Sequence, residues 1–562
     1  MKIDEFLQSL EGTPLSEANA LLKKKCGIAN FFDSSNYYVV TQSIQNSKSE
    51  YGDWQTNLQL AVSVCKKIRN KGIAPELIIE PTCGVGNFVL AALMVFGKAI
   101  KRIIAIEIFE PYLTSLKYKL LEYCINNDTE ITATIELYNQ NIFDFKYSHL
   151  NIKRNDNILI LGNPPWATNS KLSGMSSDNL PQKANYKRLR GLDAITGKGN
   201  FDIAEYITCQ ILEAFNNHNA TIALLLKTSV AKNIIYEQKW KKYFITNISQ
   251  HNIDAKQEFN VSVSACLFIA QFGNESSSIC DVYNFYNSHK INTYGWNQNS
   301  FVSDFDAYLN NQHIEGVCQL EWWSGLKHDC SKVMELERNG NLLINQLAEV
   351  VRIEDEFVYP LIKSSDIKGD IVNSSRKYII VTQMSTGDDT KKIKYKAPLT
   401  YQYLLNHTNY FEKRKSIVYK KRGPFSIFGI GQYSFKPYKI AIAGLYKDTH
   451  FSFVPPINGK CAMFDDTCYM LGFDTKEEAF CILKVLNSEP VQNFMKSIVF
   501  FDSKRSINKE VLMRIDIYAA AQQLLQAGVL DKKEFNCIEN YINKNTLGAL
   551  WAQSNEMYAL PN

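Results

Sequence analysis

The stretch ILILGNPPW, residues 158–166, decides the predicted fold and chemistry of this chain. Its four leading apolar residues predict a buried strand that ends at the following glycine. Asn163 then offers both an acceptor and donors, and Pro164 and Pro165 fix two φ angles and remove two N–H donors. Trp166 adds a flat apolar face. Together they predict a rigid corner that holds a planar ring by its amino group.

A second signal lies upstream, in LIIEPTCGVGNF at residues 77–88. A short apolar strand, a glycine-rich turn and an apolar helix open a doubly wound nucleotide-binding fold. Gly84 and Gly86 let the backbone approach a ligand closely. The third glycine of a dinucleotide fingerprint is missing, and no Gly-Lys-Ser/Thr follows. The turn therefore indicates a nucleoside pocket without phosphate-binding machinery.

The next strands complete a predicted sheet. The strand at residues 103–106 ends at Glu107, where a carboxylate can accept both hydroxyl hydrogens of a ribose. In the following unit, ITATIELYNQNIFDF, either Asn141 or Asp144 can contact an adenine edge. We expect an α/β fold: a doubly wound, mostly parallel Rossmann-like sheet with ligands at its carboxyl edge, followed by a mixed, β-rich domain.

Length and composition set the domain organisation. A chain of 562 residues predicts two or three domains. We assign residues 1–275 to the sheet domain, 276–340 to a transition segment, 341–520 to a β-rich domain and 521–562 to a helical end. The 13 cysteines contain no CxxC pair, which predicts reduced thiols and no metal site. No apolar run of 18 residues is present, so we expect a soluble, cytoplasmic protein with no membrane partner.

The second half carries a basic, aromatic stretch at residues 413–439. Its centre is Lys420, Lys421 and Arg422, and a second basic turn follows at Lys504 and Arg505. Basic residues between aromatic residues and glycines suit a surface that binds the phosphates of double-stranded DNA. A solvated surface is the alternative from charge alone.

The pieces predict one reaction. A pocket that holds ribose and adenine without phosphate suits S-adenosylmethionine. The Asn163 oxygen and the Pro164 carbonyl can accept the two hydrogens of an exocyclic amine while its nitrogen attacks the methyl group in line. In duplex DNA that amine is reached by flipping the nucleotide out. Trp166 is the predicted stacking partner of the flipped base, with Phe259 as a second face or as a core residue.

The ordered segments YGDWQT, EPTCGVGNF, AIE, NIFDF, GNPPW and LLLK resemble the gamma class of DNA amino-methyltransferases. Later segments, VYPLIKSSDI, GIGQYSFKPYKIAIAGLY, DDTCYM and FFDSKRSI, resemble the target-recognition domain of N6-adenine methyltransferases from type II restriction–modification systems. The resemblance implies that residues 1–275 are an S-adenosylmethionine-dependent methyltransferase domain and 341–520 a DNA target-recognition domain. It also implies a site-specific adenine methyltransferase that protects host DNA.

The resemblance also assigns the site. Asn163, Pro164, Pro165 and Trp166 form the catalytic motif, and Asn163 also borders the cofactor. The implied cofactor-binding residues are Thr56, Glu80, Thr82, Cys83, Gly84, Gly86, Glu107 and Asn141 or Asp144. Two positions depart from the family pattern. Asn141 stands where Asp is usual, and Thr82 stands where Ala or Ser is common.

Several alternatives stay open at this point. NPPW-type corners also occur in methyltransferases of RNA and of protein glutamine. Cytosine N4 is a second possible DNA target, although Asn163 favours adenine because the cytosine enzymes mostly carry Ser there. A non-catalytic DNA-binding protein is disfavoured by the intact corner. About 50 residues precede the cofactor motifs, so we expect any cognate restriction endonuclease to be a separate chain.

Overall fold

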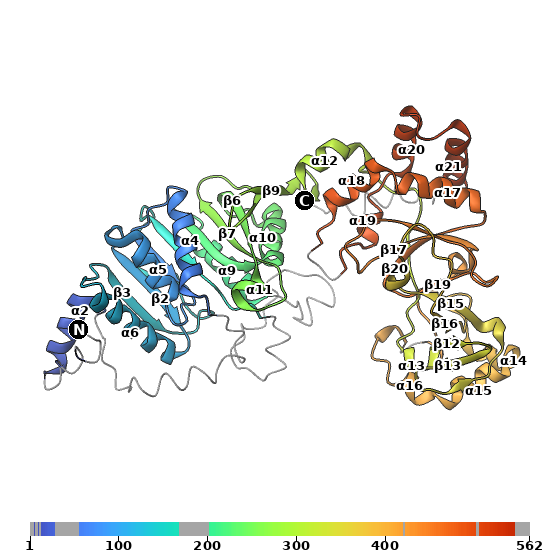
Figure 1. Cartoon of the computed structure of the whole chain (residues 1–562), viewed down its shortest axis with the longest axis horizontal. Coiled ribbons are helices and arrows are strands. Elements are labelled where there is room, and N and C mark those ends of the chain that lie inside the picture. Colours follow the sequence, from blue (N-terminus) through green and yellow to red (C-terminus); the bar gives the residue numbers. More distant parts are fainter. Residues whose placement is uncertain are drawn as a thin grey trace. The chain divides into compact units, whose positions relative to one another are not determined.

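The computed structural model describes residues 5, 9, 13–28, 55–167, 202–419, 422–501 and 505–545. The chain divides into two compact units, Met1–Phe301 and Val302–Asn562. Figure 1 labels the helices and strands of both units. Each unit is described by itself below.

The first unit is built on a ten-stranded sheet in the order β10-β9-β8-β6-β7-β5-β4-β1-β2-β3. Strands β3, β2, β1, β4 and β5 run parallel, and β7 is antiparallel to both β5 and β6. The predicted fold class, a doubly wound and mostly parallel sheet, is confirmed. The strands are β1 (Leu77–Glu80), β2 (Arg102–Glu107), β3 (Thr134–Asn139), β4 (Ile158–Gly162), β5 (Ala220–Lys227), β6 (Ile245–Ile253), β7 (Ala265–Phe272), β8 (Ile279–Asn284), β9 (Lys290–Asn297) and β10 (Ser300–Val302).

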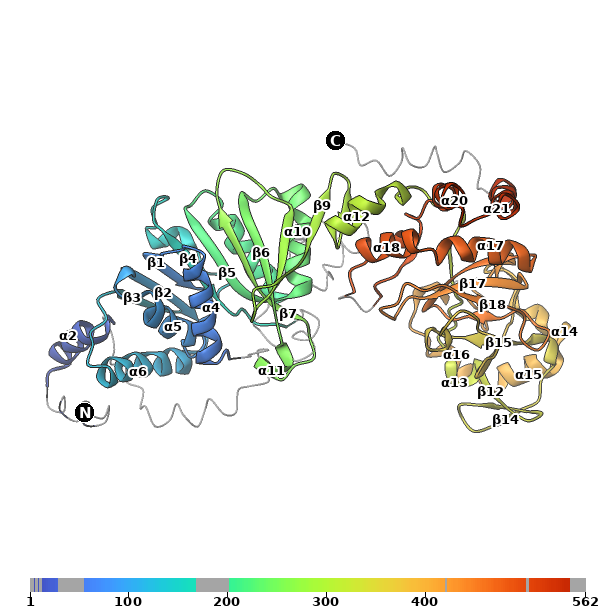
Figure 2. The same ribbon diagram turned by 45° about the horizontal axis from the view of Figure 1, so that its top comes forward.

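Helices cover both faces of this sheet, with α4, α5 and α6 on one face and α9 and α10 on the other (Figures 1 and 2). Because of this double cover, the central strands are buried on both sides: every residue of β1 and of β4 is buried. The helices are α2 (Leu15–Cys26), α4 (Leu58–Asn70), α5 (Asn87–Phe96), α6 (Glu110–Asn126), α9 (Ile203–Ala214), α10 (Thr228–Lys241) and α11 (Ala255–Phe259).

The strand register brings the predicted site residues to one edge. In β1, Ile79 is paired with Ile104 of β2 and with Ile160 of β4. The carboxyl ends of these three parallel strands therefore lie side by side. Glu80 ends β1, Glu107 ends β2, and the NPPW corner follows β4 directly.

Two parts of the sheet do not appear in the sequence prediction. Strand β6 was not expected, and residues 276–340, predicted as a transition segment, contain β8 and β9. The first unit ends instead at Phe301. These strands lie towards the edge of the sheet, where partly exposed residues weaken the hydrophobic pattern.

The second unit contains two smaller sheets. One has four antiparallel strands in the order β11-β20-β17-β18, and the other has six in the order β14-β13-β12-β16-β15-β19. The strands are β11 (Trp323–Ser324), β12 (Glu335–Asn339), β13 (Leu342–Asn345), β14 (Val350–Val351), β15 (Val358–Ile362), β16 (Lys377–Ile380), β17 (Tyr438–Ala443), β18 (Ser452–Val454), β19 (Met463–Phe464) and β20 (Cys468–Phe473).

The first helix of the second unit and the helices after β20 pack around the hydrophobic core of the four-stranded sheet, whereas helices between β11 and β17 contribute to the core of the six-stranded sheet. The core of the four-stranded sheet includes Trp322 and Phe494, which are fully buried, and residues of the last two helices. The predicted helical end at 521–562 thus begins inside this unit. The helices are α12 (Phe305–Asn311), α13 (Ser331–Met334), α14 (Ile393–Lys396), α15 (Pro398–Asn406), α16 (Thr408–Glu412), α17 (Lys476–Leu486), α18 (Glu489–Ile498), α19 (Lys509–Leu512), α20 (Ile517–Gln526) and α21 (Lys532–Asn545).

In the described ranges, no helix combines the length and the apolar character that a membrane crossing requires.

Candidate active site

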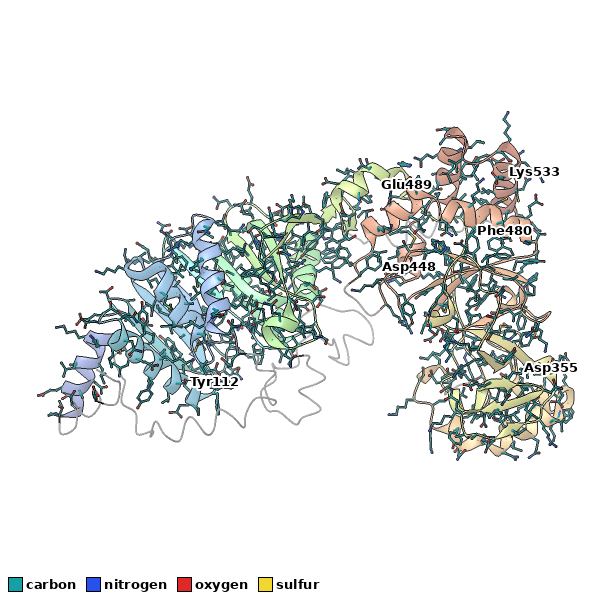
Figure 3. All side chains as sticks on the ribbon, in the orientation of Figure 1. Tyr112, Asp355, Asp448, Phe480, Glu489 and Lys533 are labelled. Atoms are coloured by element: carbon teal, nitrogen blue, oxygen red, sulfur yellow. The ribbon has the colours of Figure 1, made fainter. Side chains whose placement is uncertain are left out.

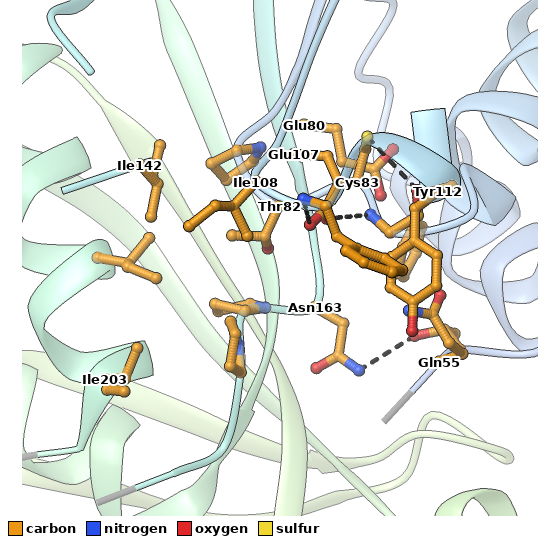
Figure 4. A pocket seen from close by; sticks show the side chains of 18 of the residues that line it. Gln55, Glu80, Thr82, Cys83, Glu107, Ile108, Tyr112, Ile142, Asn163 and Ile203 are labelled. Carbon is orange, nitrogen blue, oxygen red and sulfur yellow. Dashed lines mark hydrogen bonds between the residues drawn. The ribbon is translucent and has the colours of Figure 1, made fainter. Parts of the chain in front are cut away.

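A pocket opens at the carboxyl edge of the first unit's sheet. Figure 4 shows Glu80, Thr82 and Glu107 along one wall of this pocket and Asn163 opposite them. Tyr112 and Gln55 lie at one side, and Ile142 and Ile203 at the other. The predicted residues that line the pocket are Thr56, Glu80, Thr82, Cys83, Gly84, Glu107, Asn141, Asn163, Pro164, Pro165 and Trp166.

The glycine turn between β1 and α5 uses its two glycines differently. Both have a positive φ, +53° at Gly84 and +78° at Gly86, which disfavours other residues. Gly84 lines the pocket, whereas Gly86 does not. A Cβ added at Gly86 would lie 2.1 Å from the Leu116 side chain, so this glycine allows α5 and α6 to pack. Its predicted role as a cofactor contact has no direct geometric support.

Glu107 closes this turn from the neighbouring strand. Its Oε2 accepts a hydrogen bond from the Gly84 N–H at 2.8 Å, and its Oε1 accepts one from the Phe109 N–H at 2.9 Å. Each carboxylate oxygen has a further lone pair. Two backbone N–H groups thus hold the carboxylate in place at the wall of the pocket.

Glu80 and Thr82 supply unsatisfied polar atoms to the pocket wall. Across the described ranges, the buried side-chain atoms that lack a hydrogen-bond partner include Glu80 Oε2 and Thr82 Oγ1. Burial raises the pKa of Glu80 well above its usual range. It also raises the pKa of the neighbouring Cys83 thiol, which excludes a ready thiolate nucleophile there. A buried acid and hydroxyl without partners fit a cationic, hydrogen-bonding ligand such as the sulfonium and ammonium groups of S-adenosylmethionine.

The NPPW corner is anchored through Asn163 to the segment before α4. The Asn163 Nδ2 donates a hydrogen bond to the Thr56 hydroxyl at 3.2 Å. Because the nitrogen of the amide points to Thr56, its oxygen is the acceptor on the other side. Pro164 and Pro165 line the pocket next to it. The Asn163 amide is therefore anchored at its nitrogen end, at the wall of the pocket.

Trp166 and Phe259 lie in contact, but not as an open sandwich. Their ring centroids are 5.0 Å apart and their planes meet at 68°. A base between two parallel rings needs about 7 Å, which is two van der Waals layers. Both residues are 7% exposed, and the Trp166 indole N–H donates to the Leu225 carbonyl at 3.2 Å. Phe259 does not line the pocket.

The structure separates the two candidates for the cofactor adenine. Asn141 lines the pocket, and Asp144 does not. The Asn141 Oδ1 accepts a hydrogen bond from the Phe143 N–H at 3.1 Å, which fixes the turn after β3. Of the two predicted residues, Asn141 alone is placed to reach a ligand there.

Some lining residues were missed by sequence reasoning. Gln55 accepts a hydrogen bond from the Val85 N–H at 3.3 Å, and its position directly before Thr56 was the available signal. Tyr112 and Phe143 also line the pocket, and they look like ordinary core aromatics in the sequence. Nothing in their local pattern marks them.

A partly buried ion pair connects the end of β5 to the start of α9. Lys227 ends β5, and its Nζ lies 2.5 Å from the carboxylate of Asp202, which caps α9. Burial raises the pKa of Asp202, although Lys227 opposes that shift. The pair fixes the start of α9, whose Ile203 and Ile207 line the pocket.

The predicted DNA-contacting residues are only partly within the described ranges. Lys420, Lys421 and Lys504 lie outside them. Arg422 is exposed, donates to the Thr386 carbonyl and lies 5.6 Å from the Phe428 ring centroid. Arg505 pairs with Asp466 at 3.2 Å.

Other basic residues of the second unit are also in ion pairs. Asp355, labelled in Figure 3, pairs with Arg338 at 3.0 Å and with Lys460 at 2.7 Å. A count of basic residues therefore overstates the charge that this unit presents to a polyanion.

Comparison with known proteins gives the family. No protein-family model matches the chain. The type II methyltransferase M.NspV of Nostoc sp. (strain ATCC 29411 / PCC 7524) is 39% identical over 485 residues, which span 86% of this chain and 99% of that protein. The chain belongs to the type II methyltransferases. This confirms the predicted kinship with restriction–modification methyltransferases, and S-adenosylmethionine is the cofactor of this type II methyltransferase.

Solved structures give weaker likenesses. The type IIL restriction–modification enzyme MmeI, solved in complex with DNA, has a TM-score of 0.47 and 14% identity, over 96% of this chain and 77% of that chain. The type IIG restriction endonuclease BpuSI has a TM-score of 0.37 and 13% identity, over 90% of this chain and 63% of that chain. At such scores neither adds to the assignment of this type II methyltransferase.

Proposed function

We propose that this type II methyltransferase is a site-specific DNA adenine-N6 methyltransferase. The observation that carries the proposal is the hydrogen bond from Asn163 Nδ2 to the Thr56 hydroxyl in the corner after β4, which supports the amide oxygen as the acceptor for an exocyclic amine. Asn at this position favours adenine N6 over cytosine N4, which remains the second candidate.

The chain's own residues perform three tasks in this reaction. Asn163 Oδ1 and the Pro164 carbonyl accept the two N6 hydrogens, which pulls the nitrogen towards tetrahedral geometry and frees its lone pair. Glu107 and Asn141 hold the nucleoside of the methyl donor, which supplies an electrophilic methyl group when bound. The N–C bond forms as the C–S bond breaks, and the N6 proton leaves to solvent. Alignment and charge placement provide most of the acceleration.

The target base reaches the corner by flipping out of the duplex. A base stacked on an aromatic ring contributes on the order of 1–3 kcal/mol, which offsets part of the unstacking energy. Since Trp166 and Phe259 are too close to hold a base between them, the base stacks on one face of Trp166 or the two rings separate.

The second unit is the proposed target-recognition domain, with double-stranded DNA as its partner. Arg422 and Arg505, together with Lys420, Lys421 and Lys504, are the proposed phosphate contacts. A separate cognate restriction endonuclease is the proposed counterpart in the cell, and the methyl mark would protect host DNA from it. RNA and protein glutamine are the competing substrates.

The test is methyl transfer from labelled cofactor to genomic DNA, total RNA and a protein extract, followed by nucleoside analysis. Label recovered as N6-methyladenine in DNA supports the proposal, and label in N4-methylcytosine selects the second candidate. Label in RNA or protein, with none in DNA, contradicts both. Sequencing the methylated DNA then gives the recognition site.

A further inference from the structure

Three consecutive residues before α4 connect three separate parts of the site. The Gln55 Oε1 accepts from the Val85 N–H of the glycine turn at 3.3 Å. The Thr56 hydroxyl accepts from Asn163 Nδ2 at 3.2 Å. The Asn57 Nδ2 donates at 3.3 Å to the carboxylate of Glu258, next to Phe259. This segment thus touches the cofactor turn, the acceptor amide and the helix on the target side.

The Thr56 contact matters because an asparagine amide can face a ligand with either of its ends. If the amide turns by 180°, its Nδ2 donors face the N–H donors of the incoming amine, and no hydrogen bond forms. With an amine in the pocket, Oδ1 must face it and Nδ2 must face Thr56. The hydroxyl then accepts from the nitrogen end of the amide, so the hydrogen bond stabilises the orientation in which Oδ1 faces the amine.

Thr56 is itself held firmly. Its side chain is buried, at 5% exposure. Its carbonyl accepts from Asn87 Nδ2 at 2.7 Å, and Asn87 Oδ1 accepts from Lys119 Nζ at 2.9 Å. Asn87 is the first residue of α5 and Lys119 lies on α6, so two helices fix the backbone that carries the hydroxyl.

We propose that Thr56 is a positioning residue that holds the Asn163 amide with its oxygen towards the acceptor amine. The inference rests on the proposed amino-methyltransferase function and adds to it a residue that acts through Asn163. It differs from the cofactor contact that the family resemblance assigns to Thr56, because it predicts an effect on the chemical step at saturating cofactor.

The experiment compares Thr56→Val, which keeps the shape and removes the acceptor, with Thr56→Ser, which keeps the hydroxyl. Thr221→Val is the matched control, since Thr221 is a buried threonine at the opposite end of β5. At saturating cofactor and DNA, T56V should slow single-turnover methylation about tenfold. T56S should recover most of the rate, and T221V should match the wild type.

A double-mutant cycle separates positioning from a general effect. In an Asn163→Ser background the amide is gone, so T56V should change the residual rate less than about twofold. An equal slowing in both backgrounds overturns the proposal. A slowing that disappears when the cofactor concentration is raised also overturns it, because Thr56 would then be a cofactor contact only.

A measurement that does not depend on turnover distinguishes a failure of the positioning role of Thr56 from a failure of the proposed function. In protein labelled with ¹⁵N-asparagine, the Asn163 side-chain amide signal is the one that N163S removes. T56V should shift this signal, while T56S and T221V should leave it nearly unchanged. An unshifted signal in T56V overturns the positioning role. Absence of methyl transfer from the wild type to DNA would instead contradict the proposed function, and the amide shift would still decide the inference.

Discussion

Both units bury a charged side chain, and the comparison separates a binding site from a structural core. Glu80 in the first unit is 2% exposed, and Lys439 in the second is 0% exposed. Glu80 Oε2 lines a pocket without a hydrogen-bond partner in the described ranges. Lys439 Nζ donates at 2.8 Å to the carbonyls of both Lys436 and Ala462.

Burial shifts the pKa of both groups towards the neutral form. The pKa of Glu80 rises well above its usual range, and the pKa of Lys439 falls to about 8. The difference lies in what completes each environment. Backbone carbonyls complete that of Lys439, whereas a cationic ligand would complete that of Glu80. A buried charge therefore indicates a ligand site only where its polar atoms face a pocket unpaired.

The largest expected effect is at the pocket, in the variant Asn163→Ala. Loss of the amide oxygen should slow methyl transfer about 10²- to 10³-fold, since one positioned group that stabilises the transition state is removed. Cofactor affinity, measured by calorimetry, should change less than about threefold. Asn219→Ala, at the far end of the sheet, is the control. A parallel loss of cofactor binding would contradict the assignment of Asn163.

The next effect concerns stability in the second unit. A base whose folded pKa is depressed destabilises the fold while it is protonated, and the fold gains stability as pH rises from about 8 towards the unfolded value. Urea unfolding at pH 7 and pH 10 should show the wild type gaining about 2–3 kcal/mol relative to Lys439→Met. Lys484→Met, which removes a lysine paired with Glu534 and distant in sequence from Lys439, is the control. If the difference in unfolding free energy between the wild type and Lys439→Met is the same at both pH values, burial does not depress the pKa of Lys439. The contrast with Glu80 would then be lost.

A smaller effect is expected for Glu80→Gln. The variant keeps the shape and removes the charge, so cofactor affinity should fall about tenfold. A carboxyl with a raised folded pKa loses stability as pH rises from its unfolded value through the folded one. The cofactor-free variant should lack that loss as pH rises above the unfolded pKa of a glutamate. Glu76→Gln, which is exposed and paired with Lys101, should show neither change.

The smallest effect is expected from the basic stretch. Glutamine at Lys420, Lys421 and Arg422 should weaken DNA binding about three- to tenfold. It should also reduce the slope of log K against log salt by about 0.9 for each phosphate that is no longer neutralised. Lys484→Gln, whose lysine pairs with Glu534 at 2.8 Å, is the control. An unaltered slope would assign this stretch to the solvated surface.

Residues at the carboxyl edge of the sheet could be predicted from the sequence, for a physical reason. Parallel strands end together, so Glu80, Glu107 and the Asn163 corner could be placed near one another from strand order alone. Asn141 and Asp144 could not be separated, because three residues of a turn decide which side chain enters the pocket. The Gly-x-Gly spacing predicts Gly86 as a ligand contact, although Gly86 packs against Leu116 of α6. Spacing alone cannot distinguish a glycine that lets a ligand approach from one that lets two helices pack.

The second unit was predictable only as β-rich and basic. Whether a basic side chain is available depends on its neighbours in space, and Arg505 has Asp466 beside it, 39 residues earlier in the chain. The edge strands β8 and β9 were missed because partial exposure removes the apolar pattern that marks a strand. Contacts such as Thr56 to Asn163, 107 residues apart, lie beyond any local pattern.

The order of the pocket segments along the chain has a consequence for biosynthesis. The glycine turn, Glu107, Asn141 and the corner follow one another in sequence, and the whole ten-stranded sheet is encoded before or at the boundary near Phe301. At roughly 5–20 residues per second, a ribosome needs roughly tens of seconds more for the second unit. The nascent chain is therefore expected to complete its methyl-donor pocket well before the proposed target-recognition unit has emerged.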